Sequence, residues 1–330
     1  MSIRWGVLST ARIGRRRVIP AIQKSRNGDV VAVASRDAER ARGFADDLGI
    51  DRAYGSYADL LADDTIDAIY NPLPNNLHAE WSIAAAEAGI PMLCEKPLAL
   101  NADEAQRMVD AFEQHGVLFA EAFMYRFHPR TQRVKQLVAE GAVGDVQVIR
   151  SAFSFPLDDL NNIRLQKDLG GGALMDIGCY CVNVMRFITG EEPVHVAAQQ
   201  LLGADSGVDE TLTGLLEFPS GCLGHFDCSF RAAFENSYAI RGSEGRIVVE
   251  RSFVPITDAP TVIHLWQGDD HQTIDIPEAD HYQLMVEDFA DALLDDRPPR
   301  FAPTDAVANM RVLDRLYASA DTSNGGHAPG

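Results

Sequence analysis

Two segments of the sequence carry side chains suited to proton transfer. Lys96 stands in the peptide CEKP at residues 94–97, and Tyr180 follows a glycine-rich run, four residues after Asp176. An ammonium group near a phenol favours the phenolate, which can accept the proton of a substrate hydroxyl while hydride leaves the carbon. Asp176 and Tyr180 would share one face of a helix, so Asp176 could hold the substrate or orient Lys96. Judged singly, Lys96 could equally form a surface ion pair with Glu95, and Tyr180 could be a core tyrosine.

The elements that must position Lys96 alternate in type along the first part of the chain. Short apolar runs predict strands at residues 3–8, 30–35, 68–70, 92–94 and 117–120. Helical periodicity predicts helices at residues 12–24, 37–48, 76–88 and 101–115. This alternation is typical of a parallel, doubly wound sheet covered on both faces, so we expect an α/β Rossmann domain over residues 1–122. Ligands of such sheets bind outside the carboxyl ends of the strands, where Lys96 falls.

The second part of the chain, residues 123–330, has an α+β pattern. Strands are predicted at residues 146–155, 194–202, 212–218, 222–230, 238–241 and 246–250, and helices at 129–140, 173–188, 282–294 and 304–319. The turns at 219–221 and 242–245 fit antiparallel hairpins. We therefore expect a substrate-binding domain with a large open, mainly antiparallel sheet and helices on one face. The uncovered face would join the subunits of a homo-oligomer.

The turn after the first strand is a candidate site for the pyrophosphate of a dinucleotide. Aligned with the fingerprint G-x-G-x-x-G, it has Ser9, Ala11 and Gly14 at the three glycine positions. Small residues still permit a tight turn and close approach of a phosphate to a helix N-terminus. An ordinary strand-to-helix turn is the alternative. The residues expected to contact the cofactor here are Ser9, Thr10, Ala11, Arg12 and Ile13.

The end of the second predicted strand indicates which dinucleotide binds. Ser35 and Arg36 stand where an acidic residue would bind the ribose hydroxyls of NAD. A hydroxyl and a guanidinium instead suit a 2′-phosphate and stacking on adenine, and Arg40, one helical turn later, could add charge. Asp37 more simply caps the following helix. We therefore expect NADP as the cofactor, with NAD as the alternative.

Composition limits the partners of the protein. The 330 residues carry a formal net charge of −19, which opposes binding to nucleic acid and suits solubility, adaptation to salt or steering of a cationic ligand. No stretch approaches the roughly 20 apolar residues that span a bilayer. The five cysteines contain no C-x-x-C pair, so neither a disulfide framework nor a metal site is expected. Because the first residues lack the features of a secretory signal, we expect a cytoplasmic protein.

Several motifs together resemble the family of glucose–fructose oxidoreductase and inositol dehydrogenase (Gfo/Idh/MocA). They extend over nearly the whole chain, at residues 3–8 (IRWGVL), 71–75 (NPLPN) with His78, 95–98 (EKPL), 124–129 (MYRFHP), 163–165 (IRL), 170–180 (GGGALMDIGCY), 286–289 (VEDF) and 309–313 (NMRVL). The combination of E-K-P with D-I-G-x-Y is quite specific for this family. The resemblance implies a Rossmann domain followed by an α+β substrate domain, with the active site between them.

The resemblance also implies roles for single residues. It gives the family's lysine as Lys96 and the proton-transferring position as Tyr180, where many members have histidine. Tyrosine there is similar to the branch of glucose–fructose oxidoreductase, NADP-dependent aldose 1-dehydrogenases such as xylose dehydrogenase, and dihydrodiol dehydrogenases. The implied cofactor contacts are Pro72, Leu73, Asn75, His78, Glu95 and Lys96. The implied substrate contacts are Lys96, Arg126, Phe155, Arg164, Asp176 and Tyr180.

Three of these residues have equally plain structural interpretations. His78 could pack a helix, Arg126 could pack beneath the site, and Arg164 could be a solvated loop charge.

From these features we predict NADP-dependent oxidation of a cyclic aldose, a pentose or hexose, at its anomeric hydroxyl to the lactone. Tyr180 would accept the hydroxyl proton, and Lys96 would stabilise the developing oxyanion. The alternatives are a trans-dihydrodiol dehydrogenase, a keto-sugar or dicarbonyl reductase, and a dinucleotide-sensing regulator without chemistry. The expected partner is a small-molecule sugar or diol, with neither nucleic acid nor membrane.

Overall fold

The computed structural model describes residues 2–255 and 259–324. The chain divides into two compact units. The first comprises Met1–Met124 and Asp280–Val307, and the second comprises Tyr125–Ala279 and Ala308–Gly330. Each unit is therefore built from two separate stretches of the chain.

The segment Asp280–Val307 belongs to the first unit, whereas the sequence-based division placed everything after residue 122 in the second domain. Its helix α8 (His281–Leu294) packs in the first unit. Phe289 meets the buried Trp5 with 5.3 Å between ring centroids, and Asn27 Nδ2 donates to the carbonyl oxygen of Glu287 at 3.0 Å. The sequence shows only an amphipathic helix, and nothing in it indicates which of two sheets the apolar face covers.

The first unit is built on a six-stranded parallel sheet with the strand order β3-β2-β1-β4-β5-β6. The strands are β1 (Ile3–Leu8), β2 (Gly28–Ala34), β3 (Arg52–Tyr54), β4 (Ala68–Asn71), β5 (Met92–Glu95) and β6 (Phe119–Ala122). The predicted doubly wound sheet is thus confirmed. Strand β3 was not predicted, because this three-residue edge strand is only partly buried and so has no apolar run.

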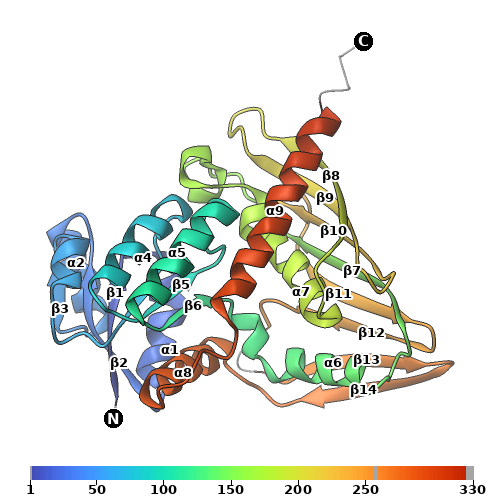
Figure 1. The fold of residues 1–330 in the computed structure, drawn as a ribbon, viewed down its shortest axis with the longest axis horizontal. Coiled ribbons are helices and arrows are strands. Elements are labelled where there is room, and N and C mark those ends of the chain that lie inside the picture. The colour runs from blue at the N-terminus through green and yellow to red at the C-terminus, as the bar shows by residue number, and fades with distance from the viewer. Residues whose placement is uncertain (1, 256–258, 325–330) are drawn as a thin grey trace. The chain divides into compact units, whose positions relative to one another are not determined.

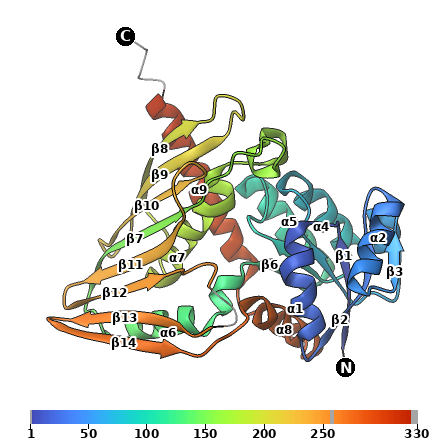
Figure 2. The same ribbon diagram turned by 180° about the vertical axis from the view of Figure 1, so that it is seen from behind.

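Helices cover both faces of this sheet. They are α1 (Ile19–Lys24), α2 (Ala38–Leu48), α3 (Tyr57–Leu61), α4 (His78–Glu87), α5 (Ala102–His115) and α8. Helices α4 and α5 lie side by side on one face, and α1 and α8 lie together on the other (Figures 1 and 2). The strand order reverses between β1 and β4, which are neighbours, so the carboxyl ends of these two strands form the switch point at which open α/β sheets bind ligands.

The second unit contains an eight-stranded sheet with the order β14-β13-β12-β11-β7-β10-β9-β8. The strands are β7 (Val146–Ser154), β8 (His195–Leu202), β9 (Asp209–Glu217), β10 (Leu223–Ser229), β11 (Glu235–Gly242), β12 (Gly245–Glu250), β13 (Thr261–Gln267) and β14 (Asp270–Ile276). Only the pair of β7 and β10 is parallel, which confirms the mainly antiparallel sheet. Strands β13 and β14 were both missed. The side chains of β14 are mostly polar and exposed, without apolar alternation, and β13 carries apolar side chains on both of its faces, which blurs a period of two.

The helices of this unit are α6 (Pro129–Ala139), α7 (Cys179–Thr189) and α9 (Pro303–Asn324), whose first residues belong to the first unit. Helix α7 packs on β7 and β10, and all three helices lie on the same face of the sheet (Figures 1 and 2). Among the described residues of this unit, no helix lies on the other face. None of the described helices is long and apolar enough to cross a membrane.

Candidate active site

The turn between β1 and the helical segment that begins at Gly14 is held by the side chain of Ser9. Ser9 has φ 100°, a conformation that favours glycine, which is what the fingerprint has at this position. Its hydroxyl donates to the carbonyl oxygen of Pro72 at 3.3 Å and accepts from the amide of Ala11 at 3.2 Å. These two hydrogen bonds offset the backbone strain and join the turn to the loop after β4, at the switch point. The turn therefore keeps the tight geometry that a pyrophosphate requires.

Two arginines lie at the end of β2 and the start of α2 without a carboxylate partner. In the described part of the chain neither Arg36 nor Arg40 forms an ion pair, although the protein is strongly acidic. Arg40 Nε donates to Thr10 Oγ1 at 2.7 Å, so the phosphate turn and the start of α2 are linked. Asp37 accepts from the amide of Arg40 at 3.0 Å, which confirms it as the cap of α2. Two cations beside the phosphate turn fit an additional phosphate group.

Tyr57, at the start of α3, belongs to the same region and was not found from the sequence. Burial raises the pKa of its hydroxyl, and the guanidinium of Arg36 beside it partly offsets that shift. Its ring meets Trp81 edge to face, with 5.0 Å between centroids. The sequence gives no signal for Tyr57, because the strand that precedes it, β3, has no apolar run.

The segment that carries Lys96 is held in place by the carboxylate of the preceding residue, Glu95. Tyr70 on β4 donates from its hydroxyl to Glu95 Oε1 at 2.6 Å, and the amide of Lys96 donates to Glu95 Oε2 at 3.3 Å. Burial, followed by the charge of Glu95, raises the pKa of Tyr70, so the phenol remains the donor. Lys96 itself is half-buried at the carboxyl end of β5. Its backbone is thus tied to the neighbouring strand.

His78 connects the loop after β4 with the turn after Lys96. Its side chain is completely buried, and burial lowers its pKa. Nε2 lies 2.8 Å from the carbonyl oxygen of Leu73, and Nδ1 lies 3.1 Å and 3.2 Å from those of Pro97 and Leu98. This arrangement favours the packing interpretation of His78 over contact with a cofactor. Of the other residues expected at the cofactor, Pro72 and Leu73 are buried and Asn75 is half-buried.

In the second unit, Arg164 and Asp176 form an ion pair, with Arg164 Nε 2.5 Å from Asp176 Oδ2. Arg164 lies in a short 3₁₀ turn, η4 (Ile163–Leu165), that Asn162 caps. Arg164 is therefore not an isolated loop charge. Both residues were predicted to lie at the substrate, but their contact was not predicted, because they are twelve positions apart in the sequence with a glycine run between them.

Tyr180 lies on α7, directly after one turn of π-helix, η6 (Leu174–Gly178), that contains Asp176. A π turn has a longer hydrogen-bonding interval than an α-helix, so a spacing of four does not by itself place both side chains on one face. The Tyr180 side chain is 4% exposed, and its ring centroid lies 5.9 Å, 5.5 Å and 5.3 Å from three other rings. We call these rings the aromatic wall; they belong to Tyr125, Phe153 and Phe253.

The two remaining residues expected at the substrate, Phe155 and Arg126, also lie in the second unit. Phe155 is half-buried, with its ring 6.4 Å from that of Phe153 and 5.4 Å from that of Phe230. Arg126 is only 2% exposed, which fits packing beneath a site better than an open subsite.

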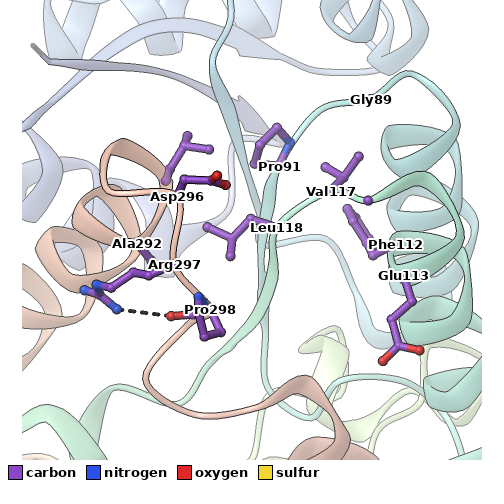
Figure 3. A pocket seen from close by; sticks show the side chains of 12 residues that line it. Gly89, Pro91, Phe112, Glu113, Val117, Leu118, Ala292, Asp296, Arg297 and Pro298 are labelled. Atoms are coloured by element: carbon purple, nitrogen blue, oxygen red, sulfur yellow. Dashed lines mark hydrogen bonds between the residues drawn. The ribbon is translucent and has the colours of Figure 1, made fainter.

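A separate cavity of about 400 Å³ lies in the first unit, between α5 and the end of α8 (Figure 3). Pro91 and Leu118, which line it, precede β5 and β6, so the cavity is at the amino ends of strands whose carboxyl ends point toward Lys96. It is therefore distinct from the expected cofactor site. The described residues contain no group of three or more histidine, cysteine, aspartate or glutamate side chains arranged to hold a metal ion.

Comparison with known proteins assigns both parts of the chain. Residues 3–123 match the model of the oxidoreductase family with an NAD-binding Rossmann fold, and residues 131–248 match that of the GFO/IDH/MocA C-terminal domain. The protein named D-xylose 1-dehydrogenase (NADP(+)) 2 of Haloferax volcanii is 42% identical over 321 residues, which cover 96% of this chain and 97% of that protein.

Two further relatives extend the range of named substrates. The trans-1,2-dihydrobenzene-1,2-diol dehydrogenase of Xenopus laevis is 37% identical over 76% of each chain. A 3-ketoreductase from Actinomadura kijaniata, solved in complex with NADP and TDP-benzene, superimposes with a TM-score of 0.92 at 32% identity, covering 97% of this chain and 98% of that one.

Substitution of His78 tests its role between the two loops. We expect His78→Ala to lower the free energy of unfolding by about 2–4 kcal/mol, because it opens a cavity and removes the one N–H by which the neutral ring donates to a buried carbonyl oxygen. Urea denaturation followed by circular dichroism measures the change. The control is His115→Ala, which removes an exposed imidazole at the end of α5 and should cost less than about 1 kcal/mol. Equal losses in the two variants would contradict the role of His78.

Proposed function

This chain belongs to the GFO/IDH/MocA family of oxidoreductases, and we propose that it oxidises a cyclic aldose, a pentose or a hexose, at the anomeric hydroxyl to the lactone. The observation that carries the proposal is the combination of the ion pair of Arg164 and Asp176 with the aromatic wall around Tyr180. A sugar offers hydroxyls to charged groups, and the aromatic wall, whose rings are at most 5% exposed, fixes the position of the Tyr180 ring rather than contacting the substrate. The relative named for D-xylose supports the same substrate class.

NADP is the cofactor in this proposal, and the first unit contains groups that fit it. The turn at residues 9–13 presents backbone amides at the start of a helix, which suits a pyrophosphate. Arg36 and Arg40 would bind the 2′-phosphate. The residues proposed for the nicotinamide half are Pro72, Leu73, Asn75, Glu95 and Lys96, with His78 acting only through the carbonyl groups that it holds. When bound, NADP supplies the acceptor for the hydride of the substrate carbon.

The proton would move between the substrate and Tyr180. Tyr180 Oη accepts the proton of the anomeric hydroxyl, and Lys96 Nζ stabilises the negative charge that develops on that oxygen. Arg164 fixes the carboxylate of Asp176, which accepts a hydrogen bond from another ring hydroxyl. Of the two roles considered for Asp176, holding the substrate is the one that its ion pair favours.

A second candidate is the oxidation of a trans-dihydrodiol, since the relative from Xenopus laevis is named for such a substrate. The half-buried ring of Phe155, unlike the buried rings of the aromatic wall, would pack on an aromatic diol as readily as on a sugar. Reduction of a keto-sugar would use the same groups in the opposite direction. A dinucleotide-sensing regulator, by contrast, would need none of Lys96, Asp176 and Tyr180. A panel of pentoses, hexoses, inositols and trans-dihydrodiols with NADP⁺ separates these possibilities.

Removal of the two groups that act on the proton tests the mechanism. We expect Tyr180→Phe and Lys96→Ala each to lower kcat for the best aldose by about 100-fold to 10,000-fold, as loss of a general base or its partner does. The KM for NADP⁺ should change much less for Tyr180→Phe than its kcat. Tyr238→Phe is the matched control, because this buried tyrosine hydroxyl in the second unit has no hydrogen-bond partner in the described structure. Full activity of either catalytic variant would overturn the mechanism.

The two unpaired arginines test the choice of cofactor. We expect Arg36→Ala and Arg40→Ala each to raise the KM for NADP⁺ by roughly 10-fold to 100-fold, since each removes a charge-assisted hydrogen bond of about 1.5–3 kcal/mol. The KM for NAD⁺ should change little. Arg42→Ala, an exposed change on the same helix, is the control. Turnover of the wild-type protein that is faster with NAD⁺ than with NADP⁺ at equal concentration would contradict this assignment.

The uncovered face of the eight-stranded sheet supports a further part of the proposal, a homo-oligomer. Large apolar side chains project from this face, at Leu201, Leu215 and Leu223, which are 68%, 60% and 53% exposed. Leu215 on β9 pairs with Ala197 on β8, and Leu223 on β10 pairs with Val148 on β7, so each of these leucines has an apolar neighbour on an adjacent strand. Exposed apolar side chains grouped on one face of a sheet are typical of an interface between subunits, which supports the homo-oligomer.

Charge placed on this face tests the interface. We expect the double variant Leu215→Glu and Leu223→Glu to shift the protein from a dimer or larger assembly to a monomer, because two carboxylates would be buried without partners. Analytical ultracentrifugation measures the mass. Leu294→Glu, at an exposed leucine of α8 in the first unit, should leave the assembly unchanged. A monomeric wild-type protein would refute the homo-oligomer.

A further inference from the structure

The helical segment that leads to Asp176 and Tyr180 begins without a cap of its own. Three glycines, residues 170–172, precede it, and the residue at its N-cap position is Ala173, whose side chain has no acceptor. The first amides of any helix need acceptors from outside the helix. Because this helix start is buried, with Ala173 and Leu174 both fully inaccessible, water does not serve.

Asp209, at the start of β9, supplies the missing acceptor. It is only 3% exposed. Its Oδ2 accepts from the amide of Leu174 at 2.7 Å, and the amide of Ala173 also faces this carboxylate. The two amides at the start of the segment are thus satisfied by a side chain that lies more than thirty residues later in the sequence.

Tyr317, on α9, completes this cap. Its hydroxyl donates to Asp209 Oδ1 at 2.8 Å and also faces the amide of Met175. A second contact comes from about two turns earlier on the same helix, where Asn309 Nδ2 donates to the carbonyl oxygen of Cys179 at 3.4 Å. Helix α9 therefore reaches the backbone at both sides of the π turn that contains Asp176.

Gly172 shows how closely the carboxylate approaches the backbone. It has φ 128°, and a Cβ at this position would lie 2.2 Å from Asp209 Oδ1 and 2.9 Å from the hydroxyl of Tyr317. No side chain fits at this position, so the residue before the helix cannot carry a capping side chain. The absence of a side chain at Gly172 leaves the space in which Asp209 caps the helix.

We propose that Asp209, oriented by Tyr317, is a positioning residue that sets the placement of Asp176 and Tyr180 for the reaction. It acts through the amides of Ala173 and Leu174 and makes no contact with the substrate. The proposal rests on the function proposed above for Asp176 and Tyr180. A carboxylate at the start of a helix binds these amides more strongly than a neutral group does, so the charge of Asp209 sets how firmly the segment is held.

The surroundings of Asp209 make that charge dependent on pH. Burial raises the pKa of Asp209 to about 6, and the hydrogen bonds from the Leu174 amide and the Tyr317 hydroxyl partly oppose the shift. The titratable groups that face it are Tyr317 from α9 and Cys228 from β10, and burial raises the pKa of both, so they stay neutral. In the described part of the chain no cation pairs with Asp209. The segment is therefore held firmly above pH 6 and less firmly below it.

Kinetics of three proteins test the proposal: wild type, Asp209→Asn and Tyr317→Phe, the two variants keeping the shape of the site. For wild type we expect kcat to include a rise through about pH 6. Asp209→Asn should lose that rise and lower kcat above pH 7 by about 10-fold to 100-fold, the scale for small misplacement of reacting groups. Tyr317→Phe should move the rise to higher pH, because it removes a hydrogen bond that favours the carboxylate. The KM for NADP⁺ should stay within about twofold, since the cofactor residues proposed above lie in the first unit.

The matched control is Tyr54→Phe. It removes a tyrosine hydroxyl that also donates to a carboxylate at 2.8 Å, that of Asp63 in the first unit. Because the hydrogen bonds with Thr65 and Tyr54 and the charge of Arg52 outweigh burial, the pKa of Asp63 is lowered to about 2. This control loses a comparable hydrogen bond but should leave the pH profile of kcat unchanged. Wild-type pH profiles in both Asp209→Asn and Tyr317→Phe would overturn the proposal.

Hydrogen–deuterium exchange separates this proposal from the proposed function, because it needs no substrate. Corrected for intrinsic exchange rates, the amides of residues 173–178 should be better protected at pH 8 than at pH 5 in wild type, and Asp209→Asn should remove this difference. Unchanged protection in Asp209→Asn would overturn the proposal whatever the protein oxidises. Failure of the wild type to oxidise any sugar or diol, together with the expected exchange, would instead refute the function and leave the cap established.

Discussion

Buried backbone polar groups beside the two candidate catalytic residues are satisfied by side chains from distant parts of the chain, and the rest of the site depends on this. An unpaired amide or carbonyl away from water costs about 1–3 kcal/mol, so irregular backbone is stable inside a protein only where such partners exist. In the first unit, His78 meets the carbonyl groups of Leu73, Pro97 and Leu98. In the second, Asp209 accepts from the amide of Leu174. Both side chains are buried and touch backbone rather than ligand-facing groups.

Local charge, rather than net charge, decides what the first unit can bind. The chain has 48 acidic and 29 basic residues, yet Arg36 and Arg40 have no carboxylate partner among the described residues. Other arginines of this unit, such as Arg4, Arg15 and Arg52, are paired with aspartates. Two arginines without a carboxylate partner next to a helix start retain a strong local attraction for phosphate even in an acidic protein. Salt screening at 0.1 M limits the range over which the distant negative charges act to about 10 Å.

The sequence allowed the fold to be predicted where periodicity is strong and local. The parallel sheet, the antiparallel hairpins and the cap of α2 by Asp37 all follow from patterns within about 20 residues, and each is confirmed. Strands β3 and β14 were missed because partly exposed edge strands carry no apolar alternation, and the inner strand β13 was missed because apolar side chains on both of its faces hide the period of two. The place of α8 in the first unit could not be predicted either, since an amphipathic helix does not indicate which sheet it will cover.

Prediction of the candidate site from the sequence is limited in the same way, to features that are local in the chain. Lys96, Asp176 and Tyr180 were chosen by type and motif, which are local properties of the sequence. The groups that hold them were not, because the contact of Asp209 with Leu174 joins residues 35 positions apart and that of Tyr317 with Asp209 joins residues 108 positions apart. One signal was present in the sequence: a helix preceded only by glycine and alanine lacks a cap. Its buried first amides then require an acceptor from elsewhere, although the sequence does not show which one.

The glycine run at residues 170–172 connects the substrate side of this segment with its buried side. Gly172 donates from its amide to the carbonyl oxygen of Arg164 at 2.9 Å, and a Cβ on Gly171 would lie 2.5 Å from that same oxygen. On its other side Gly172 meets Asp209. The loop that brings Arg164 to Asp176 and the carboxylate that caps the helix are therefore packed against the same residues. A run of glycines is usually taken as flexible, but here their missing side chains allow three segments to pack closely, so that the ion pair and the cap depend on one another.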